Sequence, residues 1–280
     1  MNVENILDNL NLISEKLFKS VEEQVYKVLD ELVIIGPEIL NQEPLKNICY
    51  SEKVNGIIII ANSLILFYII YFIFNQLINL YNGKIVENVY KFIIKITIIG
   101  IVVNYSYYIC EELLNLFKLL SECVELFCKE ITNQEITFVN LKEVIINIED
   151  FLNNDLLSLN GIIKGMVSFG SVSILINFAI RYVTVIFLIL VSPFAFISLS
   201  SNLTSGVFKS WGKLLVVNLL IQIIVKFIMI IPIVYKDTSS IMYKIILVGS
   251  IYLIYKINTF TKEFFVKITT ETGMPNLFKD

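Results

Sequence analysis

The chain has 280 residues and a formal net charge of −3, and 56% of its residues are hydrophobic. The apolar residues form runs of about 20, the length at which a helix crosses roughly 30 Å of hydrocarbon, and this pattern excludes an ordinary soluble domain. The sequence has no histidine, which excludes histidine-based acid–base catalysis and the usual zinc sites. We therefore predict an all-α polytopic membrane protein with about five transmembrane helices and with no catalytic, cofactor or metal site.

An amphipathic helix is predicted over residues 3–35, because apolar side chains recur there at steps of three and four. Its opposite face is largely acidic, and Gly36 and Pro37 end the pattern. We expect residues 1–53 to form an extracytoplasmic amphipathic N-terminal helix and linker. The apolar face of this helix either packs on the protein itself or docks a partner subunit.

The first two spans are predicted within residues 54–110, at about 56–80 and 92–110. Asn62 and Asn75 are the clearest polar exceptions in the first span, where we expect them to form interhelical hydrogen bonds. Residues 111–160 then carry ten acidic residues against three lysines, with apolar side chains at helical spacing. This segment is predicted to be an acidic amphipathic helical cap between the second and third spans.

A long apolar run follows over residues 162–199. Near its start, Gly161 and Gly165 form a GxxxG match, and small residues at this spacing let helices pack closely. As one helix the run would be about 57 Å long at ~1.5 Å per residue, which is too long for one upright span. We expect a tilted or protruding helix that breaks near Ser192 and Pro193, because proline lacks an amide donor and disfavours helix in the residue before it.

The fourth and fifth spans are predicted at about 214–234 and 239–255, so that residues 161–260 hold core spans three to five. Residues 261–280 are expected to be a cytoplasmic helix end and tail. Lysines close to the span ends indicate the cytoplasmic side of a multi-pass protein in the cell membrane. Their distribution here places the N-terminus outside and the C-terminus inside, which five spans satisfy.

Two basic side chains lie inside the apolar runs, namely Lys226 and Arg181, the only arginine of the chain. A charge near the bilayer centre costs at least about 2.5–3.5 kcal/mol on insertion scales, so both are candidate functional residues. The runs over 162–234 contain no Asp or Glu, so three arrangements remain: the cations face water in a pore, bond to carbonyls freed at the helix break or meet an acidic partner on another subunit. Arg181 either bonds to carbonyls and fixes the packing or lines a conduit, whereas Lys226 is expected to snorkel toward the far surface.

Other polar residues of this core are also candidates. Ser192, Pro193 and Gln222 are candidate intramembrane functional residues. Lys209, Trp211 and Lys213 form a short basic and aromatic stretch that we expect to be a turn at the cytoplasmic face. Such a turn could meet anionic lipid, and the tryptophan would serve as an interfacial anchor.

The order of these features resembles the core of TrbL-type proteins, the polytopic inner-membrane subunits of conjugative type IV secretion systems. Members of that family show an arginine-led apolar helix, a Ser/Ala-Pro-hydrophobic break and a basic-aromatic loop before the next span. Here the corresponding residues are Arg181, Ser192-Pro193-Phe194-Ala195-Phe196 and Phe208-Lys209-Ser210-Trp211-Gly212-Lys213. The match covers roughly residues 177–222, under a fifth of the chain.

This resemblance implies a non-enzymatic channel component of a DNA-transfer apparatus that assembles in several copies. Its partners would be other secretion subunits, including cytoplasmic ATPases, together with membrane lipid, and transferred single-stranded DNA is a further candidate. The near-complete use of lysine in place of arginine indicates AT-rich coding, which is typical of low-GC Gram-positive bacteria. The resemblance to conjugative secretion subunits further implies a plasmid or an integrative element.

The main alternative is a secondary transporter, because helices broken near the midplane build the binding sites of such proteins. Ser192 and Pro193 mark a candidate break, but the sequence has no inverted repeat and no acidic residue deep in a predicted span. A small pore-forming or toxin-immunity membrane protein is a third interpretation, although the two amphipathic segments exceed what such a protein needs. An intramembrane protease is disfavoured because the chain lacks histidine and paired intramembrane aspartates.

Overall fold

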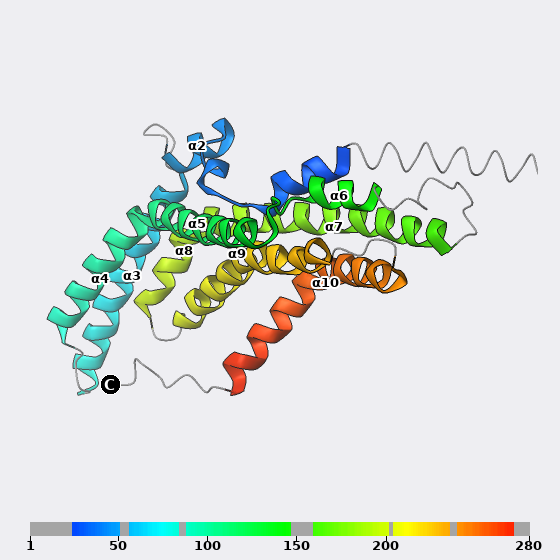
Figure 1. Ribbon diagram of the computed structural model, residues 1–280. Helices are drawn as coiled ribbons and strands as arrows, with labels where there is room; N and C mark the ends of the chain where they lie inside the picture. Colours follow the sequence, from blue (N-terminus) through cyan, green and yellow to red (C-terminus); the bar gives the residue numbers. More distant parts are fainter. Residues whose placement is uncertain are drawn as a thin grey trace, which may run out of the picture. The chain divides into compact units, whose positions relative to one another are not determined.

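The computed structural model describes residues 24–50, 56–83, 88–146, 159–201, 204–235 and 240–271, and these contain helices and no strands (Figure 1). The first helix spans residues 24–33 and is called the N-terminal helix below. A short 3-10 helix, Pro37–Ile39, follows it. The remaining α-helices are α2 (Glu43–Tyr50), α3 (Gly56–Tyr81), α4 (Val89–Asn104), α5 (Ser106–Thr132), α6 (Phe138–Ile146), α7 (Leu159–Leu190), α8 (Ser192–Ile197), α9 (Ser205–Val234) and α10 (Ile241–Glu271).

Four helices are long and apolar enough to cross a membrane: α3, α9, the Gly165–Leu190 part of α7 and the Ile241–Thr261 part of α10. The helices α4 and α5 together also meet this criterion, with a bend of 62° between them. They add a fifth span if the pair is counted as one broken span. The described part of the chain is therefore helical with four to five helices of spanning length, as the sequence predicts. The extramembrane placement of the other helices and the orientation of the termini stay predictions.

The second span differs from its predicted bounds of 92–110. The helix α4 ends at Asn104, and the backbone of Tyr105 leaves the helical region with φ −96° and ψ 9°. Cys110 consequently lies in α5, beyond the bend. The apolar pattern continues through this bend, so composition alone gives no signal of it.

The chain divides into two compact units, each described separately below. In the unit made of residues 36–116 and 183–216, α3, α4 and α8 pack against one another around a core of Ala61, Ile65, Ile99, Val103 and Phe196. Asn62 of α3 donates from Nδ2 to Asn104 Oδ1 of α4 over 3.1 Å, which confirms the predicted interhelical hydrogen bond for Asn62. Asn75 of α3 is exposed instead. Figure 1 shows α3 and α4 side by side, joined at one end as a hairpin.

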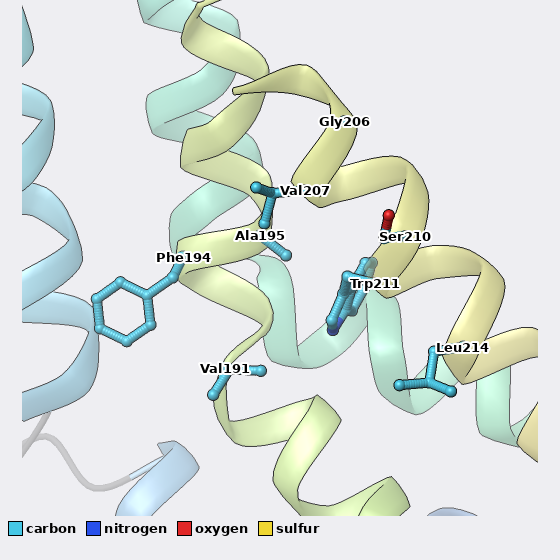
Figure 2. A pocket seen from close by; sticks show the side chains of 8 residues that line it. All are labelled: Val191, Phe194, Ala195, Gly206, Val207, Ser210, Trp211 and Leu214. Carbon is cyan, nitrogen blue, oxygen red and sulfur yellow. The ribbon is translucent and has the colours of Figure 1, made fainter. Parts of the chain in front are cut away.

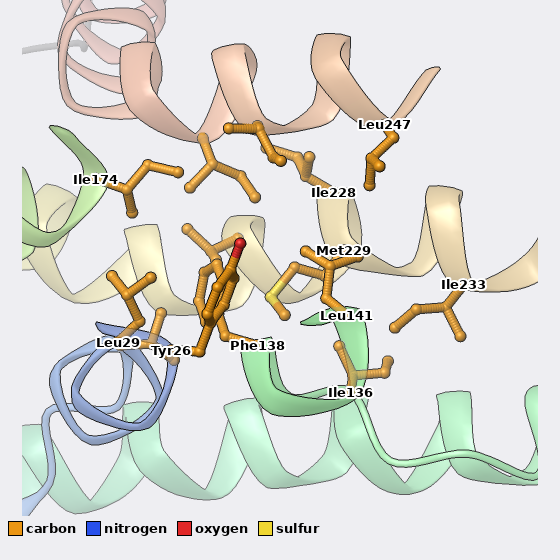
Figure 3. Close-up of a cluster of buried hydrophobic side chains, with 14 of the residues drawn as sticks. Tyr26, Leu29, Ile136, Phe138, Leu141, Ile174, Ile228, Met229, Ile233 and Leu247 are labelled. Atoms are coloured by element: carbon orange, nitrogen blue, oxygen red, sulfur yellow. The ribbon is translucent and has the colours of Figure 1, made fainter. Parts of the chain in front are cut away.

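The other unit, residues 1–35, 117–182 and 217–280, has a larger apolar core. The N-terminal helix contributes Tyr26 and Leu29 to it, and α6 contributes Phe138 and Leu141 (Figure 3). The helices α7, α9 and α10 supply the surrounding aliphatic side chains, including Ile174, Ile228, Met229, Ile233 and Leu247. The apolar face of the N-terminal helix thus packs on the chain itself over residues 24–33, while the predicted residues 3–23 lie outside the described part.

The long apolar run breaks where the sequence predicts. The helix α7 ends at Leu190, Val191 takes φ −88° and ψ 0°, and α8 begins at Ser192. Pro193 lies at the start of α8, where a missing amide proton costs nothing because the first N–H groups of a helix have no partner in it. The short helix is buried at Ser192, Pro193, Ala195 and Phe196.

The stretch expected to be a cytoplasmic turn is helical instead. The helix α9 begins at Ser205, nine residues before the predicted start of the fourth span, so Lys209, Trp211 and Lys213 lie within its first three turns. Lysine and tryptophan are compatible with helix, and the apolar pattern shows where hydrocarbon can begin rather than where the helix begins. This part of the prediction is therefore wrong about local structure.

The closest approach of a glycine to another helix occurs at Gly170 rather than at the GxxxG match. A Cβ atom built on Gly170 of α7 would lie 2.5 Å from Cγ2 of Ile251 on α10. At Gly165 no atom lies within 4 Å of such a Cβ. Within the described residues, the contact that depends on a small side chain is therefore made one and a half turns after Gly165.

We expect Gly170→Ala to lower the free energy of unfolding by about 1–3 kcal/mol, the usual cost of an added carbon in a packed interior. The β-branched side chain of Ile251 cannot easily turn away, because one χ1 rotamer dominates in helices. Gly165→Ala is the matched control on the same helix, and we expect it to be neutral or stabilising. Thermal unfolding in detergent micelles measures both changes, and equal effects would contradict the packing role of Gly170.

Candidate functional site: buried polar side chains of the helical core

Arg181 of α7 is buried, with 1% of its surface exposed. Its Nη2 atom donates to the carbonyl oxygens of Val33 over 2.6 Å and Leu32 over 3.4 Å. Both carbonyls belong to the last turn of the N-terminal helix, where no backbone N–H of the helix reaches them. The guanidinium also stands 5.3 Å from the ring centroid of Phe178, one turn away on α7.

This geometry gives the arginine the role of a helix C-terminal cap. A cation at that end offsets the partial negative charge of the helix dipole, so charge and hydrogen bonding act together. Arg181 is expected from the sequence either to bond to backbone carbonyls or to line a conduit, and it bonds to carbonyls. These carbonyls come from the N-terminal helix and not from the break at Ser192. The Nε and Nη1 atoms have no hydrogen-bond partner among the described residues.

Gln222 of α9 binds the backbone that follows the same helix. Its Oε1 atom accepts a hydrogen bond from the N–H group of Ile35 over 2.9 Å, and both residues are buried. Residues 34–36 are not helical, so their buried backbone groups need partners from elsewhere in the chain. Arg181 and Gln222, two residues predicted to be functional, thus satisfy carbonyl and amide groups within four consecutive residues.

Lys226 lies one turn after Gln222 on α9 and has 1% of its surface exposed. Its ammonium group forms an ion pair with Glu125 of α5 and donates to the carbonyl oxygen of Ser121 over 3.4 Å. The expectation that Lys226 snorkels to a surface is therefore wrong, because a carboxylate reaches it inside the unit. That carboxylate comes from the acidic segment 111–160, which the sequence suggested would be a cap apart from the spans.

Asp30 of the N-terminal helix caps α6. Its Oδ1 atom accepts from Phe138 N over 2.6 Å and its Oδ2 atom accepts from Val139 N over 3.1 Å, so one carboxylate satisfies two unpaired donors at the start of α6. Burial raises the pKa of Asp30 above its ordinary value of 3.8, and the two N–H donors partly oppose this shift. The charges of Glu125 and Lys226 act on it in opposite directions.

The predicted residues of the basic and aromatic stretch belong to the unit that contains α8. Trp211 donates from Nε1 to the carbonyl oxygen of Leu188 over 2.8 Å, and its ring packs against Phe196 and Phe208. The indole N–H thereby satisfies a carbonyl freed in the last turn of α7 by the helix break. Lys209 is exposed on α9, and Lys213 is half-buried.

The structure brings together Arg181, Gln222 and Lys226 as residues that bind the N-terminal helix, the backbone after it and α5 to α7 and α9. Sequence reasoning missed their partners Glu125 and Asp30, because acidic residues are frequent in both amphipathic segments and nothing marks these two. No group of three His, Cys, Asp or Glu side chains that could hold a metal ion occurs in the part of the chain that the structure describes. The contacts of Arg181 and Lys226 neutralise buried charge and in this way hold helices against one another.

No family model, curated protein or solved structure matches this chain.

The Lys226–Glu125 pair should respond asymmetrically to truncation. We expect Glu125→Ala to lower the free energy of unfolding by about 3–5 kcal/mol, because it leaves a buried ammonium without a counter-charge. Lys226→Met should cost about 1 kcal/mol, because 30% of the Glu125 side chain is exposed and its carboxylate can be rehydrated. Thermal unfolding of the purified variants in detergent micelles measures both values.

The double variant Glu125→Ala/Lys226→Met should be more stable than Glu125→Ala alone, since it removes the unpaired charge. Glu122→Ala is the control on α5, because Glu122 is exposed. Additive effects of the two single changes would mean that the pair does not couple the helices.

The titration of Asp30 gives a second test. Its raised pKa means that the folded chain binds more protons than the unfolded chain above pH 3.8, so its contribution to stability falls as the pH rises through the shifted pKa. We expect the stability of the wild type relative to Asp30→Asn to decrease over this interval. Chemical unfolding at a series of pH values measures the difference, with Glu130→Gln as an exposed control, and an increase would contradict the burial of Asp30.

Proposed function

We propose that this protein is a multi-pass membrane channel component of a conjugative type IV secretion apparatus of the TrbL type, in a Gram-positive plasmid or integrative element. The observation that carries the proposal is the order of elements from α7 to α9. An arginine-bearing spanning helix is followed by a break at Ser192–Pro193, a short buried helix and a second spanning helix that starts with Lys209, Trp211 and Lys213. This order is the one that the resemblance rests on.

The buried polar contacts support a structural role of this kind. Arg181 and Lys226 bind groups of the same chain, so their charges stabilise one arrangement of helices. A channel subunit that assembles in several copies needs a rigid protomer, and buried paired charges contribute to a unique arrangement. In this proposal the exposed Lys209 side of α9 faces cytoplasmic ATPases, lipid headgroups or the transferred strand.

A secondary transporter is the second candidate. The break between α7 and α8 favours it, because discontinuous helices supply binding groups in such proteins. The two candidates differ in what the isolated protein does. A transporter alone moves or binds a small solute in liposomes, whereas a secretion subunit requires its partner proteins.

The test is the frequency of plasmid or element transfer from a donor with a clean in-frame deletion of the gene. We expect transfer to fall to background while growth is normal, and the intact gene supplied in trans to restore it. A complementing copy with Arg181→Ala should fail to restore transfer, because the cap on the N-terminal helix is lost.

Membrane levels of each protein are compared by immunoblot, so that loss of function is separated from loss of the protein. The copy with Gly165→Ala serves as the matched control on α7 and should restore transfer. Unchanged transfer in the deletion strain would reject the secretion proposal and place the transporter first, to be examined by solute uptake in liposomes.

A further inference from the structure

An apolar groove lies between α8 and the first turns of α9. Its volume is about 490 Å³, and its walls include Val191 and Ala195 on one side and Val207, Trp211 and Leu214 on the other. Figure 2 shows the side chains of Val207 and Ala195 next to each other, with Trp211 and Leu214 further along α9. All of these residues belong to one compact unit.

The floor of this groove offers almost no polar group to a ligand. The hydroxyl of Ser210 is the polar side chain among the lining residues apart from the indole, and the indole N–H donates to Leu188. A groove of this composition fits a hydrocarbon chain, which needs no hydrogen-bond partner and packs against apolar side chains through van der Waals contacts. It does not fit a polar solute, because nothing in it would replace lost hydrogen bonds with water.

One edge of the groove is basic. Gly206 and Ser210 form this edge, and Lys209 and Lys213 follow Gly206 by three and seven residues, so they lie on the same side of α9. Lys209 is exposed on α9, so its ammonium group can reach a ligand at this edge. Gly206 has no side chain, and no atom lies within 4 Å of a Cβ built on it, which leaves the basic edge open.

The groove also lies at the end of a helix of spanning length. The first residues of α9 carry the lysines and the tryptophan, and the apolar part of the helix follows. Lysine and tryptophan at a helix end are typical of the headgroup level of a bilayer. A ligand with an anionic head and an apolar tail could therefore place its head beside Lys209 and its tail along the apolar lining of the groove.

We propose that this groove binds one anionic phospholipid, with an acyl chain against Val191, Ala195 and Leu214 and the phosphate at the Lys209 edge. The Ser210 hydroxyl can donate to the same phosphate group. This proposal rests on the membrane location of α9 and does not depend on a role in secretion, so it can fail or succeed independently of the transfer experiment.

Native mass spectrometry of the full-length protein, purified in mild detergent, tests the proposal. The probes are phosphatidylglycerol and phosphatidylcholine with identical acyl chains, added at equal concentration. We expect the wild type to retain phosphatidylglycerol in preference to phosphatidylcholine. Equal retention of the two lipids would overturn the proposed headgroup contact.

Two pairs of variants separate the tail from the headgroup. Gly206→Leu places a side chain in the groove and should reduce retention of phosphatidylglycerol at least tenfold. Gly212→Leu is its matched control, because Gly212 also has open space at its Cβ position but does not line the groove. Lys209→Gln should weaken phosphatidylglycerol binding about fivefold, as expected for one basic residue at an anionic surface, and leave phosphatidylcholine binding unchanged.

Lys256→Gln, at an exposed lysine of α10, is the control for the loss of a charge. Circular dichroism and the elution volume of each variant show that it has folded. Equal lipid retention by Gly206→Leu and Gly212→Leu would reject the groove as a lipid site. A change in the number of protein copies per particle in Gly206→Leu, with lipid retention unaltered, would instead assign the groove to a contact between copies.

Discussion

The main constraint on this chain is the burial of cationic side chains in an apolar helical core. Arg181 and Lys226 are both about 1% exposed, and an unpaired charge in such surroundings costs several kcal/mol. Each cation meets a partner from a segment that is not one of the long apolar helices: backbone carbonyls of the N-terminal helix for Arg181, and Glu125 of α5 for Lys226. The amphipathic segments are therefore part of the core rather than additions to its surface.

These contacts also connect the amphipathic segments with one another. Asp30 caps α6, three residues before Val33 accepts the hydrogen bond of Arg181 and five before Ile35 donates to Gln222. The N-terminal helix thus binds α6, α7 and α9 through polar groups and the same core through Tyr26 and Leu29. Apolar packing stabilises the helix but is non-directional, so it does not fix the position of the helix along its axis. The hydrogen bonds fix that position, because their geometry tolerates only small shifts.

The sequence indicates the cations and the helix break because each departs from a simple rule: a charge within an apolar run, or a proline within a helical pattern. It does not indicate their partners. Glu125 is one of ten carboxylates in residues 111–160, and Val33 offers only a backbone carbonyl, which every residue has. The start of α9 at Ser205 and the close contact at Gly170 are also set by tertiary packing, whereas the apolar pattern and the GxxxG match reflect local sequence.

The sequence separation of the arginine cap bears on the biogenesis of the protein. Arg181 follows Val33 by 148 residues, and Gln222 follows Ile35 by 187. At a synthesis rate of roughly 5–20 residues per second, the N-terminal helix exists for about 10–40 s before α9 has been made. During that time its apolar face and its last carbonyls lack their final partners. Docking of the N-terminal helix therefore cannot be completed until α9 has been made.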